Sequence, residues 1–265
     1  MGLVRRHLHL AHSLLRASFM ADLEYRANLA VKIVTDIIWY AAMLSVFEVL
    51  FRHTSTISGW TIDTTRVFMG ILFLVDALWM ILFSENLDRF SEKIRRGDLD
   101  MYLTKPVNAQ FMLSLQKWMV AYVGNLLIVL GWLAWSLSRL PDGVPWERLP
   151  LLLVVVPCAL LITYSIRFVF ATSALIFTRA DALNYIWYQI YRLGTRPDAI
   201  YPPAVRIVLL TILPVGFVAS VPARVVVQGE GIWLVGVMIA FASAAVWLST
   251  RFWKYALRFY TSASS

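Results

Sequence analysis

Long apolar runs separated by short charged stretches make up most of this chain from about residue 29 onward. A run of about 20 apolar residues can cross the hydrocarbon core of a bilayer as a single helix. The pattern therefore predicts an all-α polytopic membrane protein with one transmembrane domain over residues 1–265. The six predicted spans are Leu29–Phe51, Val67–Phe83, Phe111–Leu137, Leu151–Phe177, Ile207–Val221 and Ile232–Ser249.

The fifth predicted span carries helix-breaking signals. Pro214 lies inside it and Pro222 follows it, so this helix is expected to be kinked or to cross only part of the bilayer. After it, Val221–Gly231 is either a plain external loop or a partly re-entrant piece. The sequence leaves both alternatives open.

Residues 1–28 combine basic residues with apolar residues at helical spacing. Their apolar positions fall on one helical face, opposite Arg, His and Ser residues, which is typical of an interfacial helix on the membrane surface. A cytosolic extension of the first span is the alternative. Charged residues interrupt the stretch, so we do not expect a signal peptide.

The composition supports a membrane protein: 60% of the residues are hydrophobic and 15% are charged, against about 25% charged in soluble domains. The net charge of +8 indicates Lys- and Arg-rich cytoplasmic segments rather than a nucleic-acid partner. With six spans, most Lys and Arg outside the spans fall on the side that holds both termini. We therefore expect cytoplasmic termini, a cytoplasmic loop at Thr178–Arg206, and an external position for Arg224.

The most charged stretch, Ser84–Pro106, lies between the second and third spans on the predicted cytoplasmic side. Its apolar residues recur at helical spacing, and a solvated connector has no need of such a face. We expect it to dock a soluble partner, with packing against the protein's own membrane face as the alternative. Gly97 is expected to take a left-handed turn. The expected interface residues are Leu87, Phe90, Ile94, Arg95, Arg96, Gly97, Asp98, Leu99, Asp100, Tyr102, Lys105 and Pro106.

Four charged residues inside the predicted spans are candidates for a substrate path: Lys32, Asp36, Asp76 and Arg167. Each costs about 2.5–3.5 kcal/mol at mid-bilayer unless it is paired or hydrated. Lys32 and Asp36, four residues apart, can pair along one helical face. Asp76 and Arg167 can be partners within the chain or across a dimer. A polar lining and an ion pair that fixes helix packing both remain open.

The chain lacks the motifs of common catalysts. It contains no Gly-x-x-x-x-Gly-Lys loop, no His-Glu-x-x-His and no Gly-x-Ser-x-Gly. We therefore expect no catalytic residues, no metal site and no cofactor on this chain. A single cysteine, Cys158, excludes an intrachain disulfide.

Residues 85–108 carry a motif that resembles a known family. The core Ile-Arg-x-Gly-x-Leu-Asp-x-Tyr-Leu-x-Lys-Pro at residues 94–106 is similar to the signature of small permease subunits of bacterial type-2 ABC exporters. A preceding Glu-Asn-Leu at residues 85–87, six spans and a Tyr-Pro-Pro at residues 201–203 extend the likeness over most of the chain.

The resemblance implies the membrane-spanning subunit of an ATP-driven exporter in a bacterial inner membrane. It implies two copies of a separate ABC ATPase, which hold the ATP and Mg²⁺, and a second permease, identical or a sister chain. Segment 84–106 would be a cytoplasmic coupling helix seated in the ATPase, and 215–232 an external re-entrant hairpin. Membrane lipid is the other expected partner, and no nucleic acid is. A secondary transporter or channel that acts without an ATPase is the alternative function.

Overall fold

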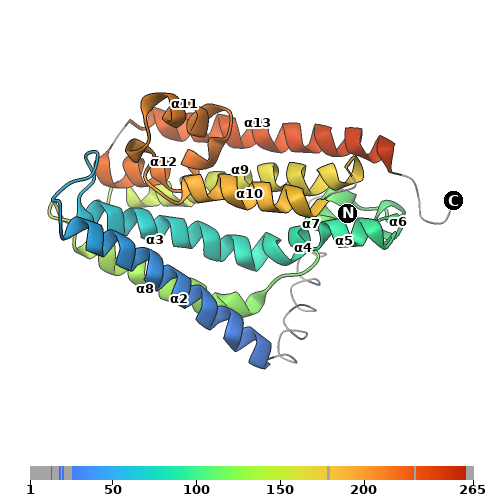
Figure 1. Cartoon of the computed structure of the whole chain (residues 1–265), viewed down its shortest axis with the longest axis horizontal. Helices are drawn as coiled ribbons and strands as arrows, with labels where there is room; N and C mark the ends of the chain where they lie inside the picture. The colour runs from blue at the N-terminus through green and yellow to red at the C-terminus, as the bar shows by residue number, and fades with distance from the viewer. Residues whose placement is uncertain are drawn as a thin grey trace.

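The computed structural model describes residues 13, 18, 20, 26–177, 180–229 and 231–260, and the elements it contains there are helical (Figure 1). The predicted surface helix at residues 1–28 lies almost wholly outside these residues. The α-helices are α2 (Arg26–Phe51), α3 (Ile62–Trp79), α4 (Glu85–Asp88), α5 (Phe90–Arg95), α6 (Asp100–Leu103), α7 (Ala109–Leu115), α8 (Val123–Ser138), α9 (Leu152–Thr172), α10 (Ala180–Gly194), α11 (Pro203–Thr211), α12 (Ser220–Ala223) and α13 (Trp233–Ala256).

Shorter helical turns extend or join these helices. Two are π-helical, Met80–Ser84 and Arg224–Gln228. The 3-10 turns are Val120–Tyr122, Leu149–Leu151, Ser173–Leu175, Asp198–Ile200, Pro214–Phe217 and Leu257–Phe259.

Within the described residues, five helical stretches are long and apolar enough to cross a membrane: Ala30–Phe51, Ile62–Arg95, Val120–Ser138, Leu149–Leu175 and Trp233–Phe259. They coincide with the predicted first, second, third, fourth and sixth spans, so the chain is a multi-pass helical membrane protein. In the bundle, α13 packs along α9, and α3 packs against α8 and α9 (Figure 1).

The second span is longer than a bilayer requires. Ile62–Arg95 has 34 residues, or about 50 Å of helix at 1.5 Å per residue, against a hydrocarbon core of about 30 Å. Its far part contains α4 and α5, so segment 84–106 begins as a direct continuation of a membrane helix. Together with α6 and α7, it forms one end of the bundle (Figure 1).

The third predicted span is interrupted at Gln116–Met119, between α7 and α8. Asn86 replaces the missing helical partners of Lys117: its Oδ1 accepts from the Lys117 backbone N at 3.0 Å, and its Nδ2 donates to the Lys117 carbonyl at 2.7 Å. The Met119 backbone N donates to the Ile81 carbonyl at 2.9 Å. The second span therefore satisfies the backbone at this break, as a low-dielectric environment requires.

The fifth predicted span, Ile207–Val221, is not a single helix. The chain leaves α9 at the end that holds α4–α7 and enters α13 at the opposite end (Figure 1). It covers this length in pieces, as α10, α11, the turn Pro214–Phe217 and α12. Pro214 and Pro222 lie within these short pieces, as expected from the donor that proline lacks.

The stretch expected as a loop at Thr178–Arg206 is largely helical in its described part. Much of it is α10, which packs on α9 and on the Pro214–Phe217 turn. Trp187 of α10 is buried, with its ring centre 6.1 Å from that of Phe170.

Asp198 holds the pieces of this broken crossing together. Its carboxylate Oδ2 accepts from Arg206 Nε of α11 at 2.8 Å and lies 3.2 Å from Arg224 Nη2. Its backbone N donates to Ser220 Oγ of α12 at 3.0 Å. Asp198 is buried, so two arginines on one carboxylate satisfy a charge that would otherwise be costly. Arg206 and Arg224 were placed on opposite sides of the membrane from the sequence, and this shared partner corrects that assignment.

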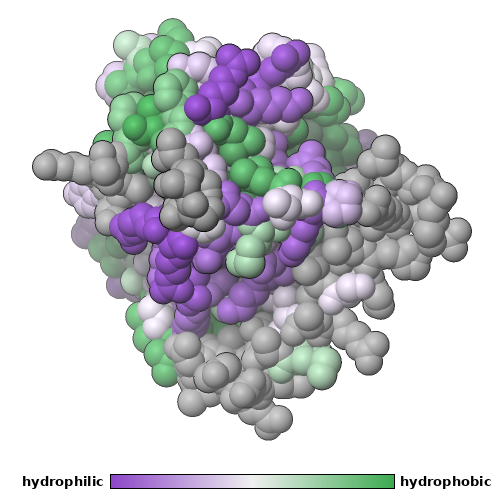
Figure 2. Space-filling model, turned by 90° about the vertical axis from the view of Figure 1, so that its right-hand side faces the viewer, coloured by the Kyte–Doolittle hydropathy of each residue, from purple (hydrophilic) through white to green (hydrophobic). Residues whose placement is uncertain are grey.

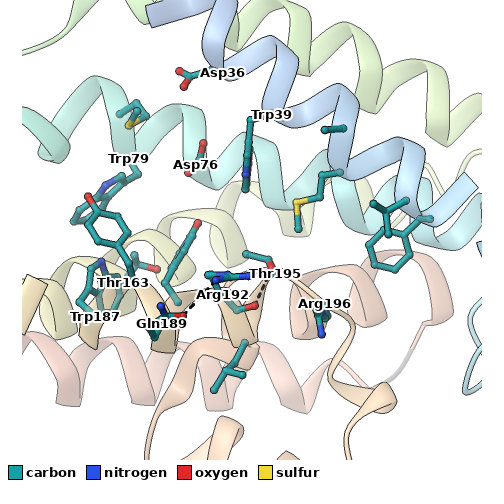
Figure 3. Close-up of a pocket in the computed structure, with 18 of the residues that line it drawn as sticks. Asp36, Trp39, Asp76, Trp79, Thr163, Trp187, Gln189, Arg192, Thr195 and Arg196 are labelled. Atoms are coloured by element: carbon teal, nitrogen blue, oxygen red, sulfur yellow. Dashed lines mark hydrogen bonds between the residues drawn. The ribbon is translucent and has the colours of Figure 1, made fainter. Parts of the chain in front are cut away.

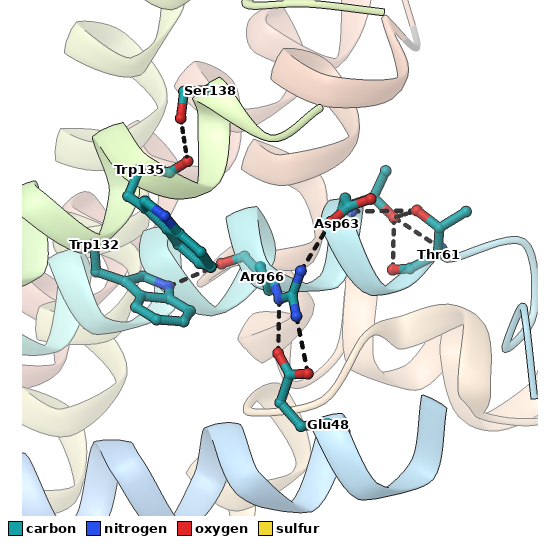
Figure 4. Close-up of polar contacts among 8 residues, drawn as sticks. Glu48, Thr61, Asp63, Arg66, Trp132, Trp135 and Ser138 are labelled. Atoms are coloured by element: carbon teal, nitrogen blue, oxygen red, sulfur yellow. Dashed lines mark hydrogen bonds and ion pairs between the residues drawn. The ribbon is translucent and has the colours of Figure 1, made fainter. Parts of the chain in front are cut away.

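The end of the bundle away from α4–α7 is closed by a cluster around Arg66 (Figure 4). Arg66 of α3 forms a bidentate pair with Glu48 of α2, at 2.6 and 2.9 Å, and also binds Asp63 at 3.0 Å. Its guanidinium lies 5.5 Å from the ring centre of Trp135, and Trp132 donates to its carbonyl at 3.3 Å. One residue thus joins α2, α3 and α8.

We predict that Asn86→Leu destabilises the protein. The substitution leaves the Lys117 N–H and carbonyl unpaired at a partly buried break, where each costs up to about 1–3 kcal/mol. Thermal unfolding of the purified chain in detergent is expected to shift down by several degrees. Gln228→Leu, which changes an exposed amide in the same way, serves as the control and should leave the midpoint unchanged. An unchanged midpoint for Asn86→Leu would contradict the role of Asn86 at the break.

Candidate functional site

A cavity of about 1070 Å³ lies between α2, α3 and α10 (Figure 3). In Figure 3, α3 forms its floor, and α2 and α10 lie on either side. A volume of this size accommodates a drug-sized or lipid-like molecule. Its aromatic lining is Trp39, Phe47, Trp79, Trp187, Tyr188, Tyr191 and Tyr201.

Two of the predicted intramembrane charges, Asp36 and Asp76, line this cavity together. Asp76 Oδ2 accepts a hydrogen bond from Tyr40 at 2.8 Å, and Asn125 Nδ2 lies 3.4 Å from the same hydroxyl. Tyr40 stacks on Phe73 with ring centres 4.2 Å apart, so the Asp76 carboxylate is held by a residue that is itself fixed.

The predicted Lys32–Asp36 pair is not among the ion pairs of the described residues. Asp36 Oδ2 is instead buried without a hydrogen-bond partner. Lys32 lines a second cavity, of about 270 Å³, together with Asp36, Glu85 and Asp88. Asp36 therefore faces both cavities.

The possible pairing of Asp76 with Arg167 does not occur within the chain. Arg167 of α9 pairs with Asp88 of α4, Nη2 to Oδ1 at 2.7 Å. The Arg167 side chain is 1% exposed and that of Asp88 is 42% exposed, so a buried charge reaches a carboxylate at the surface of the bundle end. Arg167 thus joins the membrane helices to segment 84–106 and does not line the large cavity.

Segment 84–106 packs its predicted apolar anchors inward. Leu87, Phe90, Leu99 and Tyr102 are buried, and Ile94 is partly buried against the same core. The alternative interpretation, packing against the protein's own body, therefore describes these side chains. Their burial fixes the segment rigidly to the bundle.

Phe90 shows how the segment is held. Its ring centre lies 5.9 Å from that of Phe168 in α9 and 6.0 Å from that of Trp253 in α13, both edge to face. These geometries are favourable for aromatic pairs. Phe90 of α5 thus contacts two membrane helices at once.

Tyr102 makes a second connection. Its hydroxyl donates to Gln116 Oε1 at 2.6 Å, and Lys93 Nζ donates to the same oxygen at 3.2 Å. Lys93 and Lys105 also lie 5.5 and 5.4 Å from the centre of the Tyr102 ring. Gly97 takes the expected left-handed conformation with φ of 75°, which lets α5 end and α6 begin.

The surface left exposed at this end differs from the one expected. Met101 and Leu103 of α6 are 58% and 39% exposed, and neither was predicted to belong to the interface. Arg95, Arg96 and Lys105 are exposed around them. Figure 2 looks onto this end and shows hydrophilic side chains gathered over much of the described surface there. We call Met101, Leu103, Arg95, Arg96 and Lys105 the α6 surface.

Apart from the apolar anchors, the predicted interface residues separate into two groups. Arg95, Arg96, Lys105 and Pro106 are exposed, whereas Gly97, Asp98 and Asp100 are partly covered. No local pattern distinguishes the missed pair, because Leu99, Met101 and Leu103 share one side of the alternating segment, yet only Leu99 of these three is buried. Within the described residues, no group of His, Cys, Asp or Glu is placed to hold a metal ion.

These features define a multi-pass membrane protein with a large cavity between its helices and a polar bundle end built onto one long span. The family model of ABC-2 family transporter proteins matches residues 37–264. The chain belongs to this family and is the membrane component of an ABC-2 type transporter, as the motif at residues 85–108 indicated. Membership of this family implies an ATPase partner. Permeases of this family are typically non-catalytic. Comparison with curated proteins and with solved structures returns no match.

We predict that substituting the two residues of the Arg167–Asp88 pair destabilises the protein to different extents. Asp88→Asn leaves a buried arginine without its carboxylate and should cost about 2 kcal/mol, reduced from the fully buried case because Asp88 is partly hydrated. Arg167→Met leaves Asp88 free to take up water and should cost less. Thermal unfolding of both variants and of the double variant measures the difference. A larger loss in Arg167→Met than in Asp88→Asn would contradict the assignment.

Proposed function

We propose that this chain is the membrane-spanning subunit of an ATP-driven exporter, coupled to its ATPase through the α6 surface. Two copies of a separate ABC ATPase would bind at this end of the bundle, which would face the cytoplasm of a bacterial cell, as would both termini. A second permease, identical or a sister chain, would complete the substrate pathway. The broken fifth crossing would make six passages in all, with part of 215–232 re-entrant from the outside.

One observation supports the coupling role more than any other: an exposed apolar pair stands on a rigidly held segment among exposed cations. Met101 and Leu103 offer an apolar centre, and Arg95, Arg96 and Lys105 a charged rim. This combination is typical of interface hot spots and of the charges that orient a partner.

The buried contacts of the segment support transmission of movement. Phe90 contacts α9 and α13, and Arg167 connects α9 to α4. Gln110 and Ser114 of α7 also lie 3.1 and 2.9 Å from the buried Tyr164 hydroxyl of α9. ATP-driven closure of the ATPase pair would move α4–α7 and, through these contacts, reposition α9 and α13 relative to α2 and α10.

The exposed residues of α2 support contact of this helix with a second permease or with lipid. Val31, Val34, Ile38, Val46 and Val49 are exposed apolar residues of this helix. Apolar side chains on this face of a membrane helix contact either lipid or another helix. The large cavity next to α2 would be completed on this side by the second permease.

We predict that Met101→Asp combined with Leu103→Asp removes the ATPase. Both side chains are exposed, so the substitutions should leave thermal stability unchanged while placing two negative charges in the apolar centre of the interface. At least a tenfold loss of ATPase in pull-downs from membranes that contain both subunits is expected.

Trp146→Asp is the matched control, because Trp146 is also exposed and apolar but lies in the connection before α9, away from the α6 surface. Leu99→Asp is unsuitable for this test because Leu99 is buried and its loss would unfold the segment. Full ATPase retention and normal export by the double variant would contradict the proposal. Transport by the purified chain without any ATPase would favour a secondary transporter or channel.

A further inference from the structure

Three carboxylates line the large cavity, Asp36, Asp76 and Asp88, and the first two differ from the other acidic groups of the bundle. Glu48, Asp63, Asp88 and Asp198 each have an arginine partner. Within the described residues, neither Asp36 nor Asp76 has an ion-pair partner. Unpaired carboxylates between membrane helices are costly and are typical of functional sites.

The geometry of these two groups indicates a site built for a partner that the chain does not supply. Asp76 accepts a hydrogen bond from the Tyr40 hydroxyl through Oδ2, and its side chain lines the cavity. Asp36 has a buried oxygen, Oδ2, without any hydrogen-bond donor. Lys32, one helical turn away on α2, forms no ion pair with it. Buried polar atoms are rarely left without a partner, so this oxygen can accept a donor from a bound molecule.

Aromatic rings surround the same space. Trp39 and Trp79 come from α2 and α3, and Trp187, Tyr188 and Tyr191 from α10 (Figure 3). The faces of aromatic rings attract cations, most strongly when water is excluded. Carboxylates and aromatic rings together therefore favour an organic cation with an apolar body.

Two arginines also line the cavity, and their environment differs from that of Asp36 and Asp76. Arg192 and Arg196 of the α10 wall are exposed, and Arg192 donates to the Gln189 side chain at 3.4 Å. Both arginines lie on the α10 side of the cavity, whereas Asp76 lies on the α3 side (Figure 3). The α2 and α3 walls therefore carry the unpaired negative charges and the α10 wall carries the positive ones.

We propose that this cavity binds the positively charged group of an amphipathic substrate, with Asp36 and Asp76 as its counter-charges and the aromatic rings around its apolar body. The proposal rests on the proposed function, because it assigns the substrate class of the same pathway. Asp36 also lines the smaller cavity, where Lys32, Glu85 and Asp88 are the other charged residues.

Two ions of the same shape and opposite charge test this inference: tetraphenylphosphonium and tetraphenylborate. Their binding to the full chain in lipid nanodiscs is measured by equilibrium dialysis, with empty nanodiscs subtracted. We expect saturable phosphonium binding, at least tenfold tighter than borate binding. Asp76→Asn keeps an oxygen that can accept from Tyr40 and removes only the charge, so it should weaken phosphonium binding at least tenfold. Asp36→Asn should weaken it in the same direction.

Asp142→Asn, which removes an exposed charge outside the cavity, should have no effect. Asp76→Glu retains the charge and should preserve more phosphonium binding than Asp76→Asn. Absence of saturable phosphonium binding, equal or tighter borate binding, or phosphonium affinity that survives both aspartate substitutions would overturn the inference. Weaker borate binding in Arg192→Gln would then assign an anionic substrate instead.

The binding assay contains no ATPase, so the two proposals fail separately. A chain that binds the phosphonium through Asp76 but never retains an ATPase contradicts the exporter function and not the cation site. A chain that retains its ATPase through the α6 surface but prefers the borate contradicts only the cation site.

Discussion

The hydrocarbon core of a bilayer leaves no water for an unpaired backbone N–H or carbonyl, and this constraint shapes the whole chain. Most of the chain meets it with long helices, but the helices are broken at Gln116–Met119 and through the fifth crossing. At the first break, the buried Asn86 from a distant segment supplies partners to the backbone of Lys117. In the fifth crossing, the buried Asp198 joins the pieces through Arg206, Ser220 and Arg224.

The same constraint separates structural charges from charges that are available for function. Arg66, Arg167 and Asp198 are charged residues with close partners, and each joins separate helices. Asp36 and Asp76, by contrast, have no ion-pair partner in the described part of the chain. Both line the large cavity. Their position on α2 and α3, opposite α10, places them where a movement of the bundle would change the shape of the cavity.

The sequence predicted the helical class, five of the spans and the importance of segment 84–106, because apolar runs and one specific motif carry that information. Gly97 was also predicted correctly, since a left-handed turn after two basic residues is a local property. The break at Gln116–Met119 depends on Asn86, which is 31 residues from Lys117, so no local pattern reveals it. The hydrogen bond from Asp198 to Ser220, 22 residues away, and that from Tyr40 to Asp76, 36 residues away, were missed for the same reason.

The sequence also did not predict in which direction the apolar face of segment 84–106 packs. Leu87 and Phe90 form an apolar face that fits a partner protein or the chain's own helices equally well, and the structure turns it inward. Met101 and Leu103 became the exposed pair as a result. The packing of α10 on α9 was not predicted either, because a mixture of aromatic and basic residues suits the surface of a bundle as well as a loop.

The central claim is that this membrane chain receives its driving force from a separate ATPase bound at the α4–α7 end. Native mass spectrometry of the assembly purified from its own membrane tests this claim most directly. The account predicts a complex with two permease chains and two nucleotide-binding subunits, and a cross-link from a cysteine placed at Met101 to the ATPase. An intact, transport-competent assembly that contains no nucleotide-binding protein would contradict it.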